Sequence, residues 1–169
     1  MTVTRAPLDD VFDPPEEEWT PLSPRYADMK RLMVLITYGI ETIIVVAALA
    51  FFTKWWIAAI AGGVMVAWMV FRYLRQGPLA RSWAYAERDN DLFIRHGIWF
   101  RDLVVVPYGR MQVIEVNSGP IDRKYGLATV KMVTAAATTD ATIPGLEADA
   151  AAALRERLSA RGEAQAAGL

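Results

Sequence analysis

The sequence contains few of the side chains from which enzymes build active sites. It has no cysteine and a single histidine, His96, which lies in the predicted turn Arg95-His96-Gly97. Thiol catalysis and thiolate metal sites are therefore excluded, and a zinc site would have to be built mainly from carboxylates. No glycine-rich phosphate-binding loop is present in the sequence either. We predict a protein that is not an enzyme, with no catalytic residue, metal ion or cofactor.

Cationic side chains are the main candidates for binding. Several lie at or near predicted turns in the C-terminal half of the chain, and an arginine can pair with a phosphate group through two hydrogen bonds. Close to an anionic membrane surface, each basic residue gains about 1 kcal/mol of attraction. Asp102 and Asp122 stand near such cations, so the alternative is a solvated surface of ion pairs. The candidate contacts to a lipid head group or a partner are Arg95, Arg101, Arg110, Arg123 and Lys124.

Glu41 is the one ionisable residue inside a long apolar run, where a charge costs at least about 2.5 kcal/mol on membrane-insertion scales. One interpretation is a protonated carboxyl group that hydrogen-bonds to Thr37, Tyr38 or the following helix. The other is contact with a partner membrane protein or with a second copy of the chain. Small residues four apart let helices approach closely, within one hairpin or between proteins. These candidate intramembrane residues are Ala58, Ala59, Gly62 and Gly63.

Two apolar runs, residues 32–52 and 55–71, contain no lysine or arginine. At about 1.5 Å of rise per residue, each run approximates the ~30 Å hydrocarbon core of a bilayer. Only Thr53 and Lys54 separate them, which forces two helices into an antiparallel hairpin. We expect transmembrane helices over about residues 32–52 and 55–73.

The charges beside the hairpin predict its orientation. Lysine and arginine are frequent just outside the two outer ends, whereas the turn between the helices offers only Lys54. The positive-inside rule therefore places both termini in the cytoplasm of a multi-pass membrane protein. The flanking cations are Arg25, Lys30, Arg31, Arg72, Arg75 and Arg81.

Changes in composition divide the rest of the chain. Residues 1–24 are rich in proline and acidic residues, which predicts a disordered tail. The juxtamembrane segment and hairpin take residues 25–75, and Gln76-Gly77-Pro78 is expected to end the second helix. A small domain follows over residues 79–160, with a flexible tail over 161–169. Within the domain we expect strands over 82–87, 92–95, 98–106, 111–117, 128–134 and 139–143.

A helix over Leu146–Leu158 is predicted to close this domain, because the segment is rich in alanine and has acids in its first turn and arginines in its last. Gly162 is expected to mark the end of the helix. About 80 residues of short strands and one helix suit a small barrel or sandwich whose open end or face the helix covers.

A series of short motifs links the hairpin and the strands to a known family. They are Leu22-Ser23-Pro24-Arg25, Ile94-Arg95-His96-Gly97-Ile98, Val106-Pro107 with Arg110 and Gln112, Gly119-Pro120, Arg123, Gly126-Leu127-Ala128, Thr134-Ala135 and Ile143-Pro144-Gly145-Leu146. In order and spacing, about residues 19–160 resemble the bacterial pleckstrin-homology-like membrane proteins, the bPH or YdbS-like group, in a short form with one module.

The resemblance implies an α+β membrane protein. An N-terminal two-helix transmembrane hairpin would precede a small antiparallel β split barrel of PH-like type, with seven strands and a capping C-terminal helix. It would place the domain at the inner face of a bacterial cell membrane, and it implies no reaction.

Together these features predict a membrane-anchored PH-like interaction module. We expect an accessory or assembly subunit that docks on other membrane proteins, or on a second copy of itself, at the cytoplasmic face. The alternative is a sensor that recognises anionic lipid head groups through basic turns. Nucleic-acid binding is disfavoured, because the formal net charge is −1 and no basic helix is present.

Overall fold

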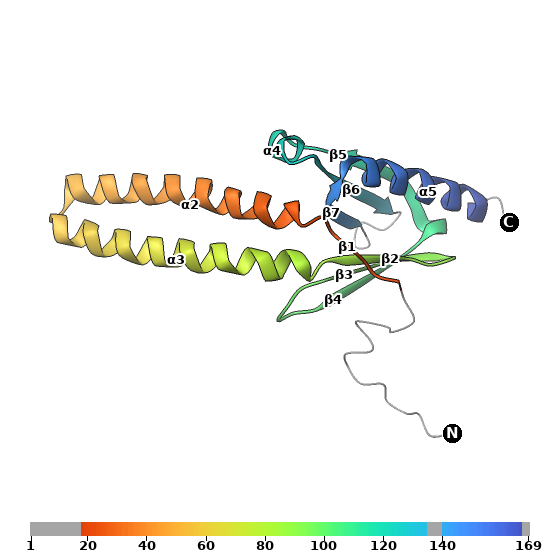
Figure 1. The fold of residues 1–169 in the computed structure, drawn as a ribbon, viewed down its shortest axis with the longest axis horizontal. Helices are drawn as coiled ribbons and strands as arrows, with labels where there is room; N and C mark the ends of the chain where they lie inside the picture. The colour runs from red at the N-terminus through yellow and green to blue at the C-terminus, as the bar shows by residue number, and fades with distance from the viewer. Residues whose placement is uncertain (1–17, 135–139, 167–169) are drawn as a thin grey trace, which may run out of the picture.

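The computed structural model describes residues 18–134 and 140–166, which form a long helical hairpin attached to a small domain of two sheets and a closing helix (Figure 1). Most of the predicted N-terminal tail, residues 1–17, and residues 167–169 lie outside the described residues. The elements are β1 (Thr20–Pro21), α2 (Arg25–Phe52), α3 (Trp55–Arg81), β2 (Ala84–Glu87), β3 (Asp91–His96), β4 (Asp102–Pro107), the 3-10 helix η1 (Tyr108–Arg110), β5 (Met111–Asn117), α4 (Pro120–Lys124), β6 (Leu127–Thr134), β7 (Ala141–Glu147) and α5 (Ala148–Ala166).

The predicted hairpin is confirmed: α2 and α3 lie antiparallel and are joined through Thr53 and Lys54 (Figure 1). Both helices are long and apolar enough to cross a membrane. Most of their large apolar side chains point away from the hairpin, and Ile43, for example, is 70% exposed. Such a surface suits hydrocarbon rather than water.

Both helices extend beyond their apolar runs on the side of the domain. α3 continues through Gln76-Gly77-Pro78, so the prediction that these residues end the helix is wrong. Pro78 cannot donate the helical hydrogen bond to the carbonyl of Leu74, so contacts elsewhere must offset this loss. Gly77 is buried against α2, where an added Cβ would lie 2.6 Å from the guanidinium of Arg31. This close packing keeps the segment helical.

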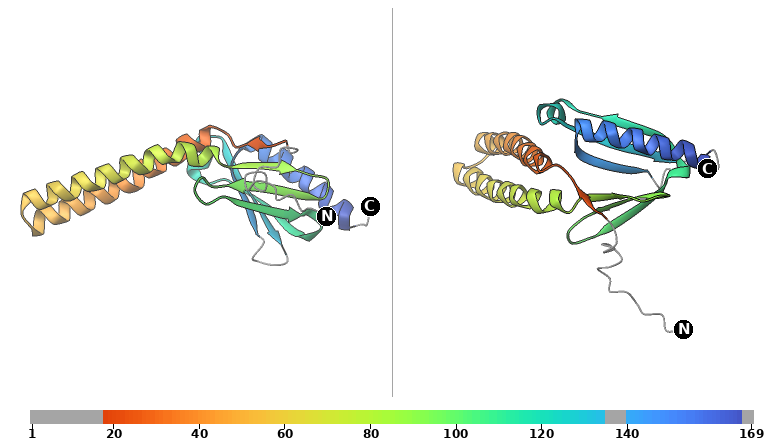
Figure 2. Two further views of the ribbon diagram at one scale, coloured as in Figure 1. Left: turned by 90° about the horizontal axis from the view of Figure 1, so that it is seen from below. Right: turned by 45° about the vertical axis from the view of Figure 1, so that its right-hand side comes forward.

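The domain contains two antiparallel sheets, one ordered β1-β2-β3-β4 and the other β5-β6-β7. They form separate layers, with α5 against the second sheet (Figure 2), and together make an open split barrel rather than a closed one. The α+β fold predicted from the resemblance is confirmed. Strand β1 falls within the segment that the composition assigned to the tail, and it pairs with β2 through Thr20↔Tyr85.

Alternating side chains of both sheets meet in one apolar core. From Ala128 onward every second residue of β6 is buried, the pattern of a strand with one face inward. The core is completed by apolar side chains of α5 and by residues at the start of α2. Its fully buried members include Leu92, Ile94, Val106, Tyr108, Val130, Met132, Ile143, Leu154 and Leu158.

Several element boundaries differ from the sequence predictions. β4 begins at Asp102 rather than at Ile98, because residues 97–101 form the turn between β3 and β4. β7 extends through Leu146 to Glu147, so α5 begins two residues later than expected. α5 also continues past Gly162 to Ala166. Gln165, beyond that glycine, donates a hydrogen bond to the carbonyl oxygen of Asn90, a long-range contact that local sequence does not reveal.

The domain packs directly against the start of α2. Leu22, Tyr26 and Met29 are buried members of its core. The Ser23 amide donates to the Gly145 carbonyl over 3.3 Å. Gly145 has φ of +66°, and an added Cβ would lie 2.3 Å from ring atoms of Tyr26. The direction of the hairpin relative to the domain is therefore set by core contacts rather than by a linker.

At the other end of the domain, α5 is fastened to the β2–β3 turn and to η1. Arg161 donates to the carbonyl of Arg88 and, over 2.9 Å, to the Tyr108 hydroxyl. Burial raises the pKa of Tyr108, and the hydrogen bond from Arg161 opposes this rise only in part. Arg157 adds an ion pair with Glu87 at 2.7 Å. We call this part of the molecule the distal end, and the part next to the hairpin the proximal end.

Candidate functional site at the proximal end

The β3–β4 turn and α4 both lie at the proximal end, on either side of the helix pair (Figure 1). Each stands beside a shallow depression that contains arginine. The predicted contact residues therefore do not form one site. Four of them divide between two basic clusters, and the fifth lies elsewhere.

The first cluster surrounds the β3–β4 turn. Arg95 and Arg101 flank this turn, as predicted, and Arg81 joins them from the last turn of α3. The three line a depression of about 200 Å³ together with Ser82, His96, Gly97 and Asp102. The Arg95 guanidinium lies 4.4 Å from the ring centroid of Trp19, which holds its stem against the sheet. Three arginines around one depression can bind an anionic group such as a phosphate.

His96 has a structural role next to this cluster. Its ring stacks on Trp83 at 4.3 Å, and its Nδ1 lies 3.7 Å from a carboxylate oxygen of Asp102. It is the only histidine of the chain. Among the residues that line the depression, Ser82 is the one that carries a hydroxyl group. The Ser82 hydroxyl accepts a hydrogen bond from the Gly97 amide over 3.1 Å and so helps to shape the turn.

The tip of the β3–β4 turn carries three consecutive apolar residues, which the sequence analysis assigned to a strand. Trp99 is 83% exposed and Phe100 is 87% exposed, and Ile98 is exposed as well. The turn is fixed by Gly97, whose φ of +101° is unfavourable for other residues. The signal that could have revealed the turn is Gly97, two residues before the aromatic pair and between two strands of equal length.

The second cluster lies beside α4. Arg123 and Lys124 are exposed there, and Arg25 at the start of α2 lines the same depression. The helix is held by its own cap, since the Gly119 amide donates to a carboxylate oxygen of Asp122 over 2.9 Å. Arg25 also lies 3.9 Å from Glu147, an exposed and weak ion pair. This cluster can contribute general attraction to an anionic surface.

Arg110 is separate from both clusters. It lies in η1, which follows the end of β4 opposite to the β3–β4 turn, and is therefore at the distal end. Its side chain is exposed, but it cannot share a ligand with Arg95 or Arg101.

The candidate residues inside the hairpin divide into two groups. Ala58 is buried between the helices, and an added Cβ at Gly62 would lie 3.1 Å from Val46. These two residues pack the hairpin against itself. Ala59 is exposed, and Gly63 has open space around the position of an added Cβ. This second pair faces outward, where another helix could approach.

Glu41 lies on the exposed surface of α2, near the middle of its apolar run. The hydrogen bonds expected from one interpretation are not formed: among the described residues, Glu41 has no hydrogen bond or ion pair. The nearby Thr42 hydroxyl instead donates to the carbonyl of Tyr38 over 2.7 Å. The carboxyl group therefore points toward whatever surrounds the hairpin in the membrane.

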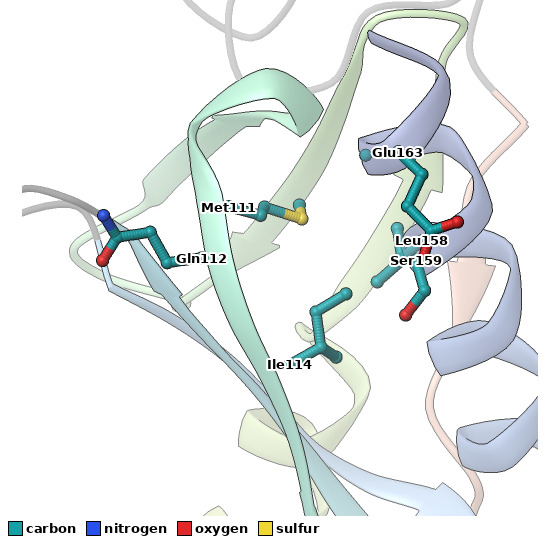
Figure 3. Close-up of a pocket in the computed structure, with 7 residues that line it drawn as sticks. Met111, Gln112, Ile114, Leu158, Ser159 and Glu163 are labelled. Atoms are coloured by element: carbon teal, nitrogen blue, oxygen red, sulfur yellow. The ribbon is translucent and has the colours of Figure 1, made fainter. Parts of the chain in front are cut away.

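A further depression, of about 290 Å³, lies between β5 and α5 (Figure 3). Met111 and Ile114 form one wall, and Ser159 and Glu163 belong to the helix on the other side. β5 is the last strand of its sheet, so its outer edge has no partner strand. Within residues 18–134 and 140–166, no group of three or more His, Asp or Glu side chains could hold a metal ion. Apolar and polar side chains line the depression together.

Comparison with known proteins decides the family. Residues 33–162 match the family model described as Bacterial PH domain. The chain belongs to this bacterial PH-domain family. The match covers the hairpin as well as the sheets, so the helices are part of the family's pattern. The UPF0699 transmembrane protein YdbS of Bacillus subtilis (strain 168) is 32% identical over 149 residues, which are 85% of this chain and 92% of that protein. No solved structure gives a significant match.

These findings confirm the resemblance on which the fold was predicted. They also agree with the two apolar helices, which are two candidate spans, in making this bacterial PH-domain protein an integral membrane protein. The family does not assign a reaction or a ligand. What the protein binds must be argued from the surfaces described above.

Proposed function

We propose that this bacterial PH-domain protein is a non-enzymatic accessory or assembly subunit, which docks on other membrane proteins or on a second copy of itself at the cytoplasmic face of the membrane. The observation that carries the proposal is the position of Glu41. An exposed carboxyl group near the bilayer centre is unfavourable against lipid, by about 2.5 to 3.5 kcal/mol when charged. A polar group on a neighbouring transmembrane helix would remove much of this cost.

Two further features support docking. Ala59 and Gly63 offer an outward surface without large side chains, on which another helix can pack closely. The unpaired edge of β5, next to the depression beside α5, adds a place on the domain where a partner strand could pair. The cytoplasmic placement rests on the cations that flank the outer ends of the hairpin.

The test is purification of the tagged full chain from its native membrane in a mild detergent, followed by mass spectrometry of the intact complex. We expect a partner membrane protein or a second copy in stoichiometric amount. Glu41→Gln should lower the recovery of this partner or second copy, since it removes the charge. Glu41→Leu should abolish that recovery, since it removes the polar group as well.

Ile43→Gln is the matched control. Residue 43 lies about 200° around the helix from residue 41 and is also exposed, so its glutamine adds a polar group to the other side of α2. Recovery should be unchanged in this variant. Equal recovery in all four proteins, or a chain that is always monomeric and alone, would overturn the proposal.

Recognition of anionic lipid head groups is the second candidate, favoured by the three arginines around the β3–β4 depression. The full chain is needed for its test, because Leu22, Tyr26 and Met29 belong to the core of the domain. In nanodiscs, Arg95→Ala with Arg101→Ala should reduce retention of phosphatidylglycerol over phosphatidylcholine. Arg110→Ala, at the distal end, should leave it unchanged. Equal retention in all variants would exclude this candidate.

A further inference from the structure

Trp99 and Phe100 contribute almost nothing to the packing of the domain, since each is more than four-fifths exposed. The turn that carries them is nevertheless well defined, by the positive φ of Gly97 and by its hydrogen bond to Ser82. Two adjacent large aromatic side chains held in water by a fixed turn are unfavourable unless something covers them.

Strand register places this turn close to the membrane. β2 starts directly after α3, and Ala84 at its beginning pairs with Arg95. Residues 97–101 follow β3 and therefore extend beyond the start of β2. They lie beside the C-terminal end of α3. Figure 1 shows the turn in this position, on the side from which the hairpin extends.

The side chains around the turn have the order expected at a membrane interface. The aromatic residues are at the exposed tip of the turn, and Arg81 and Arg101 line the depression beside it. Tryptophan and phenylalanine partition to the boundary between acyl chains and head groups, and arginine reaches the phosphates. On α3 itself, Arg72 directly follows the apolar run 55–71, and its guanidinium lies 5.9 Å from the Tyr38 ring of α2.

We propose that the β3–β4 turn inserts Trp99 and Phe100 into the interface of the bilayer that holds α2 and α3, with the Arg81, Arg95 and Arg101 depression turned toward the lipid phosphates. The domain then lies against the membrane through a second, apolar contact in addition to the hairpin. A lipid surface is favoured over a protein partner because the core contacts of Tyr26 and Met29 already hold the turn beside the bilayer.

This inference deepens the lipid candidate but does not require charge recognition, and it is independent of docking through Glu41. The experiment therefore uses bilayers of phosphatidylcholine alone and, in parallel, bilayers with phosphatidylglycerol. Insertion in both with no preference for phosphatidylglycerol would support the turn as an apolar anchor while removing head-group recognition.

The chain has no cysteine, so single labelling sites can be introduced without other changes. A nitroxide is attached to Ile98→Cys, which leaves both aromatic anchors in place. Asp89→Cys, in the exposed β2–β3 turn at the distal end, is the aqueous control. Ile43→Cys, on the exposed surface of α2, is the hydrocarbon control. Collision rates with oxygen, which enters the bilayer, and with a water-soluble nickel complex are compared in purified, reconstituted protein.

We expect the oxygen-to-nickel ratio at residue 98 to lie between the two controls and several-fold above that at residue 89. Adding Trp99→Ala and Phe100→Ala to the Ile98→Cys chain should lower its ratio to the aqueous value. Because the preparation contains no other protein, a partner cannot produce this protection. Equal ratios at residues 98 and 89 in the unaltered turn would overturn the proposal. So would a ratio at residue 98 that does not change when both aromatic side chains are removed.

Discussion

The two ends of the domain use similar residues in opposite ways. At the distal end, Arg161 donates to a buried tyrosine hydroxyl and a backbone carbonyl, and Arg157 pairs with Glu87. At the proximal end, Arg81 and Arg101 are exposed around a depression, next to the exposed side chains of Trp99 and Phe100. The charged and aromatic groups named at the distal end make contacts within the fold, whereas Trp99 and Phe100 at the proximal end are more than four-fifths exposed.

The difference shows where binding should be sought. Side chains whose hydrogen bonds are satisfied within the fold, like those of Arg157 and Arg161, gain little from a partner. A surface that holds aromatic side chains in water on a rigid turn gains from being covered. The proximal end is also the one that the hairpin keeps next to the bilayer, so position and chemistry agree.

The proximal end does contain one strong folding contact, and breaking it should have the largest effect. Gly145→Ala forces a side chain into positive φ and against the Tyr26 ring. We expect the free energy of unfolding in detergent micelles to fall by about 2 to 4 kcal/mol. Denaturation followed by tryptophan fluorescence measures this change. Gly63→Ala, at an open position, should cause no loss, and equal effects of the two changes would contradict the assignment of Gly145 to the core.

At the distal end, Arg161→Ala should lower the free energy of unfolding by about 1 to 3 kcal/mol, since it removes a charged donor from the buried Tyr108 hydroxyl and the Arg88 carbonyl. Arg155→Ala is the control on the same helix, because among the residues that the structure describes Arg155 has only an exposed contact with Glu156. The same unfolding assay applies. If both variants are as stable as the parent, the distal end does not depend on this arginine.

The exposed aromatic residues should contribute least to folding. In detergent, Trp99→Ala is expected to change the free energy of unfolding by no more than about 0.5 kcal/mol, as for other exposed positions. Thermal unfolding of the parent and variant, measured side by side, provides the comparison. A loss as large as that of Arg161→Ala would mean that the turn belongs to the folded core and that the two ends do not differ in the way described.

Much of the fold could be predicted from the sequence, because apolar length and alternation act locally. The runs 32–52 and 55–71 are too long and too apolar for another interpretation, and the alternation in β6 is regular. The boundaries that failed depend on distant contacts. α3 continues through Pro78 because Gly77 packs on Arg31, and α5 passes Gly162 to reach the β2–β3 turn through Gln165.

The candidate site was predicted only in part. The flanking positions of Arg95 and Arg101 follow from their distance in the chain and from the glycine between them. Arg81 lies beside them only because of the register of β2 with β3. Arg110 lies far from them because it follows β4, which runs from the β3–β4 turn to the distal end. The apolar turn was missed because isoleucine, tryptophan and phenylalanine all favour strands, and exposure depends on the fold.

The central claim, docking within the membrane through the Glu41 surface, is tested most directly by photo-crosslinking in the native membrane. A photoreactive residue in place of Ile44 lies three residues from Glu41, on the same side of α2, and Ile43 provides the control on the other side. We predict a discrete adduct of residue 44 with a membrane protein or a second copy of the chain, and lipid adducts at residue 43. Lipid adducts alone at both positions would contradict the claim.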